Sequence, residues 1–165
     1  MKKWCIWLLC LLLLPGCSAV ETFETLGVIA HTEPAPAPIR PVVLMMPADA
    51  VRSTLSAGPD LLYECGEYSI LLQTRQSGDL SATIMGLSGF APDHLTVVCS
   101  SCGDHDRYDW VWSAAGEGTD LLCRAAVLDD GAYHYCLLVM APESVSGDLT
   151  EQWNQLFGSF CLEAQ

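Results

Sequence analysis

The chain has 165 residues, 51% of them hydrophobic, and it carries 20 acidic against 7 basic residues, a formal net charge of −13. This length accommodates one domain and a tail, and the composition is unlike that of collagen, of a coiled coil or of a wholly disordered chain. Because so acidic a chain repels phosphate backbones and offers no basic patch, we expect neither nucleic acid nor an anionic lipid surface as its partner.

Residues 1–16 have the pattern of a signal peptide. Lys2 and Lys3 form a short positive region, and an uninterrupted apolar run extends from Trp4 to Leu14. A run of this length is typical of the apolar part of an export signal, and it is too short to cross a bilayer as a helix. The sequence therefore predicts that the chain is exported from the cytoplasm.

The leader ends in Leu14-Pro15-Gly16-Cys17, which resembles the lipobox of bacterial lipoproteins. In that family the cysteine becomes the N-terminus of the mature chain and carries a diacylglyceryl group. The resemblance implies that Cys17 is lipidated and attaches the chain to the outer leaflet of the cytoplasmic membrane. Several acyl chains, at about 0.8 kcal/mol for each buried methylene, hold a protein there stably. An ordinary secretory signal that is cleaved nearby is the alternative.

Residues 17–41 predict an extended tether. They show no helical or strand period, and prolines alternate with other residues from Pro34 to Pro38. Alternating proline blocks helix and favours the polyproline II conformation, which at ~3 Å per residue reaches several tens of Å over a stretch of this size. We expect one folded domain over residues 42–165 to follow this spacer. A ligand for a proline-binding domain is the alternative interpretation.

The domain should begin with short strands. The apolar run 42–46 lies between two prolines and predicts an edge strand, and residues 47–61 predict an irregular connection. Residues 63–74 predict a hairpin that turns at Gly66, because apolar residues alternate on one face after the turn. The first part of the domain is therefore expected to be β structure.

A short helix and another strand are expected next. Apolar residues recur at helical spacing from Leu80 to Leu87, Ser77-Gly78-Asp79 can cap the start, and Gly89 can end the helix. The apolar, β-branched run over residues 94–99 then predicts a strand. The helix thus interrupts the series of strands once.

Three further strands should complete the sheet. Residues 107–113 alternate strictly, and the apolar runs 121–128 and 132–140 flank Asp129-Asp130-Gly131. Asp-Gly between apolar runs is among the strongest signals for a β-hairpin. The alternation in the first of these strands predicts one core-facing side, which carries Tyr108, Trp110 and Trp112.

The chain should close with an amphipathic helix that starts at Ser146-Gly147-Asp148, with Asp148 and Glu151 as a capping pair. The apolar stripe of this helix comprises Leu149, Trp153, Leu156, Phe157 and Phe160. Strands that are grouped together, with helices set apart, predict the α+β class. We expect an antiparallel meander of about five to seven strands with both helices packed on one of its faces.

This order of elements resembles the PsbP-like superfamily, a group that also includes bacterial lipoproteins and a nuclear-transport factor. The resemblance rests on the closing run Leu156-Phe157-Gly158-Ser159-Phe160 and on Tyr133-His134-Tyr135 in a hairpin, and it covers about residues 62–165. Members of that family are mostly non-catalytic and act by binding partners. The resemblance therefore implies a binding or accessory protein and provides no active site to transfer.

Six cysteines follow Cys17, namely Cys65, Cys99, Cys102, Cys123, Cys136 and Cys161. An even number in an exported chain fits disulfides, but the sequence does not choose among their connectivities. In the last hairpin, a turn at residues 130–131 would place Cys123 and Cys136 diagonally, and a turn at residues 129–130 would place them opposite each other. We expect both to be small buried thiols.

Cys99-Ser-Ser-Cys102 is the sharpest chemical motif and, together with His105, supports the alternative of a thiol-redox or metal-binding envelope protein. A redox pair of this spacing needs a helix N-terminus to lower a thiol pKa, and turn residues follow here instead. Zinc needs a fourth ligand, and no second pair of this kind is present. We therefore expect a loop with two thiols or a local disulfide, without a metal or another cofactor.

The remaining candidates for chemistry are weaker. Asp104, Asp106 and Asp109 do not follow the calcium-loop pattern and predict a solvated acidic loop. His134 alternates with apolar residues, which favours a structural role over catalysis. We expect no enzyme, but a lipid-anchored, extracytoplasmic binding or accessory protein of the bacterial cell envelope. Besides the membrane at Cys17, its partner would be an envelope protein or a small ligand.

Overall fold

The computed structural model describes residues 36–55, 59–116 and 118–164. Its strands are β1 (Val42–Val43), β2 (Val51–Arg52), β3 (Leu61–Cys65), β4 (Tyr68–Gln76), β5 (Val98–Ser101), β6 (Asp106–Ala115), β7 (Asp120–Asp129), β8 (Tyr133–Pro142) and β9 (Cys161–Leu162). Its helices are α2 (Leu80–Ser88), the 3-10 turn η1 (Pro92–His94), α3 (Glu143–Ser146) and α4 (Thr150–Ser159). No helix in these ranges is long and apolar enough to cross a membrane.

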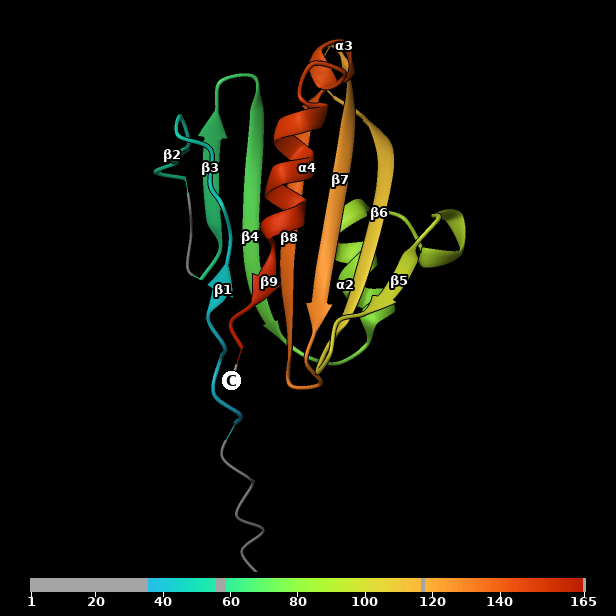
Figure 1. The fold of residues 1–165 in the computed structure, drawn as a ribbon. Coiled ribbons are helices and arrows are strands. Elements are labelled where there is room, and N and C mark those ends of the chain that lie inside the picture. The colour runs from blue at the N-terminus through green and yellow to red at the C-terminus, as the bar shows by residue number, and fades with distance from the viewer. Residues whose placement is uncertain (1–35, 56–58, 117, 165) are drawn as a thin grey trace, which may run out of the picture. The chain divides into compact units, whose positions relative to one another are not determined.

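Seven strands form one antiparallel sheet in the order β2-β3-β4-β8-β7-β6-β5, and β1 pairs with β9 in a separate two-stranded sheet (Figure 1). The strands follow one another in groups, β1–β4 and β5–β8, and pair antiparallel, so the predicted α+β class is confirmed. The run at residues 42–46, predicted as an edge strand, forms only the short strand β1. The last hairpin carries β8 into the middle of the sheet, beside both β4 and β7.

The two long helices lie on opposite faces of the large sheet. Along β7, Ala126 and Leu128 belong to the core beneath α4, whereas Ala125 and Val127 belong to the core beneath α2. Figure 1 shows α4 in front of the sheet and α2 behind it. The prediction that both helices cover one face is wrong, because β7 and β8 are apolar at successive positions and only a cover on each face buries both sets.

Each core has an aromatic centre. Beneath α4, Tyr68 and Trp153 pack edge to face with ring centroids 6.4 Å apart, and the Arg124 guanidinium lies 4.1 Å from the Phe157 ring centroid. Such a guanidinium is attracted by the negative face of the ring.

Opposite, the core beneath α2 is centred on two tryptophans of β6. Trp110 and Trp112 are buried and stack with ring centroids 6.1 Å apart, next to Ile84 of α2. This packing confirms the core-facing side predicted from the alternation of residues 107–113. Tyr108, the third aromatic residue of that side, is partly buried against the same core.

The start of α2 follows the prediction, but the start of α4 does not. The Asp79 carboxylate accepts a hydrogen bond from the N–H of Ser81 at 2.9 Å, and Gly89 ends the helix at φ 77°. At α4 no side chain caps the first turn. Leu149 before it is itself helical, with φ −89° and ψ −4°, so the extended residue that a capping box needs is missing.

β5 begins at Val98, later than the predicted strand at residues 94–99. Pro92 opens the short turn η1, and its carbonyl accepts a hydrogen bond from the N–H of Leu95 at 3.1 Å. Proline is pre-organised for the first position of a helical turn, so the start of the predicted strand is taken up by this turn. The strand register with β6 then starts at Val98, opposite Asp109.

The β7–β8 hairpin has a longer loop than either predicted turn. β7 ends at Asp129 and β8 begins at Tyr133, so the loop comprises residues 130–132, and Asp129 pairs with His134. The Asp130 carboxylate accepts hydrogen bonds from the N–H groups of Ala132 and Tyr133, at 2.9 and 2.7 Å. These two bonds to a side chain take the place of backbone hydrogen bonds that a tighter turn would form, and they stabilise the wider turn.

Residues upstream of β1 contact the domain. The hydroxyl of Tyr133 donates to the carbonyl of Ala37 at 2.9 Å, and the N–H of Arg40 donates to the hydroxyl of Tyr135 at 2.9 Å. The side chain of Arg40 is 9% exposed, which is low for a cation. The last residues of the predicted tether 17–41 therefore lie fixed on the folded domain.

A buried histidine joins α2 to the end of the central hairpin. His134 of β8 is fully buried, and its Nδ1 forms a 2.8 Å hydrogen bond with Oγ1 of Thr83 on α2. Its Nε2 lies 3.5 Å from the Asp129 carboxylate and 3.4 Å from the Ser77 hydroxyl. Both ring nitrogens face protein partners and the ring is not exposed, which agrees with the structural role predicted for this residue.

We expect Thr83→Val to destabilise the fold, because it keeps the shape of the side chain and leaves Nδ1 of His134 buried without its partner. An unsatisfied buried polar atom costs about 1–3 kcal/mol. Urea unfolding measures this loss, and the 15N signals of the His134 ring report the lost bond. Thr83→Ser, which retains the hydroxyl, should keep those signals; wild-type stability and an unchanged His134 signal in Thr83→Val would contradict the prediction.

Candidate functional site

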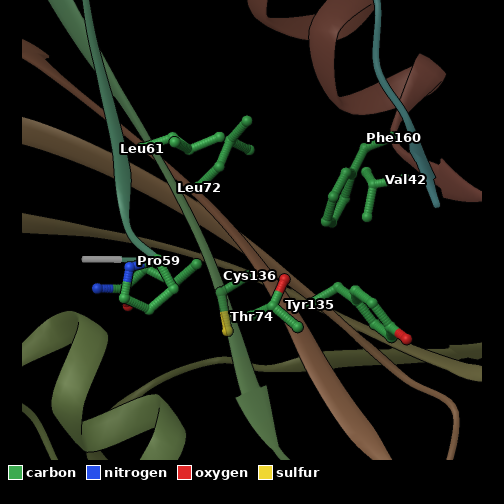
Figure 2. Close-up of a pocket in the computed structure, with 9 residues that line it drawn as sticks. Val42, Pro59, Leu61, Leu72, Thr74, Tyr135, Cys136 and Phe160 are labelled. Atoms are coloured by element: carbon green, nitrogen blue, oxygen red, sulfur yellow. The ribbon is translucent and has the colours of Figure 1, made fainter. Parts of the chain in front are cut away.

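An apolar groove lies on the α4 face, between the β1–β9 pair and the strands β3 and β4. Its volume is about 120 Å³. Figure 2 shows Val42 and Phe160 on one side of it and Leu61 and Leu72 on the other. Its apolar and aromatic lining comprises Val42, Pro59, Leu61, Leu72, Tyr135 and Phe160.

The groove forms where the cover provided by α4 ends. α4 stops at Ser159, and Phe160 continues in an extended conformation, with φ −71° and ψ 103°, into β9. Beneath it, Leu61 and Leu72 are cross-strand partners that share one face. The thin β1–β9 pair covers this part of the sheet less completely than a helix would, and the hollow remains between them (Figures 1 and 2).

No catalytic group is assembled in the groove lining. Gln73 alternates with Leu72 along β4, so its amide points to the α2 face, where it donates to Asp60 at 2.7 Å and accepts a hydrogen bond from Arg75. The side chain of Cys136 belongs to the core beneath α2, and burial raises the pKa of its thiol to about 12, so this sulfur is a protonated, poor nucleophile near neutral pH. The groove is suited to holding an apolar group and not to reacting with it.

The floor of the groove is fixed by the hydroxyl of Tyr135. This hydroxyl accepts a hydrogen bond from the N–H of Arg40 and donates one to the Asp130 carboxylate at 3.0 Å. The hydroxyl of Tyr135 therefore has both a donor and an acceptor partner at the end of the sheet. Only the ring of this residue faces the groove (Figure 2). The tyrosine joins three parts of the chain: the segment before β1, β8, and the β7–β8 loop.

Arg40 extends this network to the β5–β6 loop and to the C-terminal strand. Its Nη1 lies 2.8 Å from the Asp104 carboxylate, and its Nη2 donates to the carbonyl of Glu163 at 2.8 Å. The Nε of Arg40 is buried and has no hydrogen-bond partner among the described residues. A charge so enclosed is retained only with partners of this kind, so Arg40 fixes the chain segment that leads into β1.

The predicted site residues are not brought together. Cys17 lies outside the described residues. Cys99 pairs with Tyr108, whose side chain packs on the α2 core, whereas Cys102 pairs with His105 through a 2.8 Å N–H to carbonyl bond across the hairpin. Cys99 lies on β5, and Cys102 follows its last residue in the same register with β6, so at ~3.3 Å per residue the two lie about 10 Å apart and point to opposite faces.

Consequently, the Cys99-Ser-Ser-Cys102 motif lacks the geometry for a shared metal ion or a local disulfide. His105 is directed to a different partner, since its Nδ1 lies 2.9 Å from the Asp104 carboxylate. Within residues 36–55, 59–116 and 118–164, no three histidine, cysteine or acidic side chains are grouped to hold a metal ion.

The acidic residues of the β5–β6 region are also engaged separately. Asp104 pairs with Arg40, while Asp109 pairs with the guanidinium of Arg107 at 2.6 Å. A shallow hollow of about 360 Å³ gathers Asp104 and Asp106 near Asp129 and Asp130, but it does not include Asp109. The structure therefore keeps the predicted acidic loop and does not form a three-carboxylate cluster from these residues.

The buried cysteines are thiols held in the cores. Cys123 lies opposite Met140 and Cys136 opposite Val127, so neither of the two predicted juxtapositions occurs. Burial raises the pKa of Cys123 to about 11. The expectation of small buried thiols agrees with this arrangement, and the longer β7–β8 loop explains the difference in register.

Comparison with known proteins supports the fold. No protein-family model and no curated protein matches the sequence. Among solved structures, cyanobacterial PsbP (CyanoP) from Synechocystis sp. PCC 6803 superposes with a TM-score of 0.54 at 10% identity, covering 74% of this chain and 86% of CyanoP. A protein from Bacteroides thetaiotaomicron superposes with a TM-score of 0.52 at 11% identity, covering 75% of this chain and 46% of that protein.

LpqN, which is involved in cell envelope biogenesis of Mycobacterium tuberculosis, superposes with a TM-score of 0.51 at 14% identity, covering 74% of this chain and 83% of LpqN. At such identities the similarity concerns the fold alone. The chain has an α+β fold like that of cyanobacterial PsbP, in agreement with the order of elements that suggested the PsbP-like superfamily.

We expect the Asp130 network to make stability depend on pH. Burial pushes the pKa of Asp130 upward, but hydrogen bonds from the Tyr133 and Ala132 N–H groups and from Tyr135 outweigh it and hold this pKa below its ordinary value of 3.8. A carboxyl group with a depressed folded pKa stabilises the fold above the unfolded pKa, and this contribution is lost as the pH falls through the folded pKa.

Asp130→Asn should therefore be less stable than wild type near neutral pH, and the difference should shrink below about pH 4. Urea unfolding over a pH series measures this convergence. Tyr135→Phe, which keeps the carboxyl group but removes one of its donors, should show a smaller pH-dependent difference. A gap between wild type and Asp130→Asn that stays constant as the pH falls would contradict the assignment.

Proposed function

We propose that the protein is a lipid-anchored, extracytoplasmic accessory protein of the bacterial cell envelope that binds a small apolar group in the groove beside β1 and β9. The observation that carries the binding role is the groove of about 120 Å³, whose lining is apolar and provides no pair of groups for catalysis. The leader pattern and the fold shared with LpqN, a protein of cell envelope biogenesis, support the location.

The size of the groove limits its ligand. An apolar cavity of about 150 Å³ binds benzene, so a hollow slightly smaller than this admits a short alkyl chain or a single small ring. Its lining offers Tyr135 with a hydroxyl already bonded to Asp130, and Gln73 already bonded to Asp60. Recognition would therefore rest on burial of apolar surface, at about 25 cal/mol per Å².

The binding proposal can be tested with an alkyl diazirine of about four to six carbons, a length chosen for a groove of this size. The full chain in lipid nanodiscs is irradiated with this probe, and labelled residues are mapped by mass spectrometry. We expect labels on the groove residues Leu61, Leu72 and Phe160. Leu72→Trp, which fills the groove, should reduce labelling roughly tenfold, equivalent to a loss of about 1.4 kcal/mol of binding.

Val111→Trp is the matched control, because Val111 is 52% exposed on β6 and does not line the groove. This variant should label like wild type. Equal labelling of Leu72→Trp and wild type, or labels concentrated around Val111, would overturn the groove as the binding site. A second variant that fills the groove, Leu61→Trp, should show the same loss of labelling. It separates filling of the groove from any local effect of the change at Leu72.

The lipid anchor has its own test. Cells that express the full chain are fed an alkyne analogue of palmitate and then fractionated. We expect wild type to carry the analogue and to sediment with membranes, because acyl chains hold it there. Cys17→Ser should lose both properties, while Cys5→Ser, which alters another cysteine of the leader, should keep them. A labelled, membrane-bound Cys17→Ser protein would contradict lipidation at this residue.

A further inference from the structure

Three of the six cysteines after Cys17 are exposed in the described part of the chain: Cys99, Cys102 and Cys161. The other three are buried, and burial raises the pKa of Cys65 and Cys123 to about 11 and of Cys136 to about 12. A thiol must lose its proton to react in disulfide exchange, so oxidation should be confined to the exposed three.

Cys99 is separated from the other two by the sheet itself. It pairs with Tyr108, which packs on the α2 face. Ser100 is paired with Arg107, and the Nη1 of Arg107 donates to the carbonyl of Phe160, at the end of α4. Cys102 follows the last residue of β5, and its N–H to the carbonyl of His105 continues the register that pairs Ser101 with Asp106, so Cys102 lies on the α4 side together with Ser100.

Two arginines join the hairpin that carries Cys102 to the strand that carries Cys161. Arg107 donates to the carbonyl of Phe160 at 3.1 Å, one residue before Cys161. Arg40 spans from Asp104, two residues after Cys102, to the carbonyl of Glu163, two residues after Cys161. The segments that carry the two cysteines, far apart in sequence, are thus held together by two guanidinium groups.

The electrostatics of Arg107 agree with this placement. Its pKa lies above the ordinary value, first because of its hydrogen bond to Asp109 and, in smaller part, because of the charges that Cys102 and Cys161 carry as thiolates. Both sulfur atoms therefore lie within the field of one guanidinium group.

We propose that Cys102 and Cys161 form the intrachain disulfide of the oxidised protein and so lock β9 to the β5–β6 hairpin. Its formation in the cell rests on the envelope location proposed above, where oxidising surroundings favour disulfides. Closing so long a loop restricts the unfolded chain, so the bond should stabilise the C-terminal strand beside the groove.

The reaction requires a disulfide oxidant, such as oxidised glutathione or a thiol oxidase of the envelope. The thiolate of one cysteine attacks a sulfur of the oxidant, forms a mixed disulfide and releases one thiolate. The thiolate of the second cysteine attacks the protein sulfur of that mixed disulfide, forms the new S–S bond and releases the second thiolate. Two electrons pass to the oxidant, and the two cysteine protons end on its thiolates.

The test uses the full chain, purified in detergent, reduced, and then equilibrated with oxidised glutathione before free thiols are alkylated. We expect the oxidised protein to lose two alkylation sites and about 2 Da, the mass of two hydrogens. Peptide mapping without reductant should show Cys102 joined to Cys161, with Cys99 alkylated. The thermal midpoint should rise on oxidation and fall again with reductant.

Cys99→Ser should form the same cross-link, whereas Cys161→Ser should leave Cys102 alkylated and lose the rise in thermal midpoint. All three side chains are exposed, so serine is tolerated at each position and circular dichroism confirms the fold. A Cys99–Cys102 bond, a disulfide between two chains, or glutathione adducts alone would overturn the proposal.

Alkylation in intact cells separates this inference from the proposed location. A cross-link that forms in the purified protein but is absent in cells supports the disulfide geometry and contradicts the envelope location. A cross-link found in cells supports both. Its absence from the purified, oxidised protein overturns the disulfide and leaves the tests of the lipid anchor and of the groove unaffected.

Discussion

The burial of β7 and β8 on both faces is the constraint on which the rest of the structure depends. Leu137 and Val139 of β8 are fully buried against one core, while Cys136 and Leu138 between them are buried against the other. A strand that is apolar at every position cannot leave either face in water without a large cost. The chain must therefore place one helix on each face. The connection from β4 to β5 does this, because it crosses the sheet and carries α2 over the second face.

This requirement also explains the groove. Ten residues of α4 span about 15 Å, whereas ten residues of β8 span about 33 Å, so the helix covers less than half of the strand beneath it. The remaining length is covered by β9 and by the segment around Val42. These two strands have only two residues each and do not cover all of this length, so the apolar hollow beside Leu72 and Phe160 remains.

Sequence patterns within a few residues predicted the ends of a helix well, but they did not predict contacts between residues far apart in the chain. Asp79 and Gly89 delimit α2 through their own side chain and backbone conformation, so the sequence nearby predicts both ends. The face that each helix covers depends on the crossing of the whole chain, which periodicity does not contain. The groove and its fixing by Arg40 were not predictable, because Arg40 and its partner Tyr135 are 95 residues apart.

Arg40 lies in the sequence between Cys17, the proposed site of the lipid anchor, and Val42, which lines the groove. It is held by Tyr135, Asp104 and the carbonyl of Glu163, and two residues later Val42 enters the groove as part of its wall. The same segment continues upstream toward Cys17, where the lipid is proposed to attach. A ligand in the groove would therefore contact the strand that follows the tether directly. Removing the Arg40 contacts would loosen one wall of the groove, so the shape of the binding site depends on these few long-range hydrogen bonds.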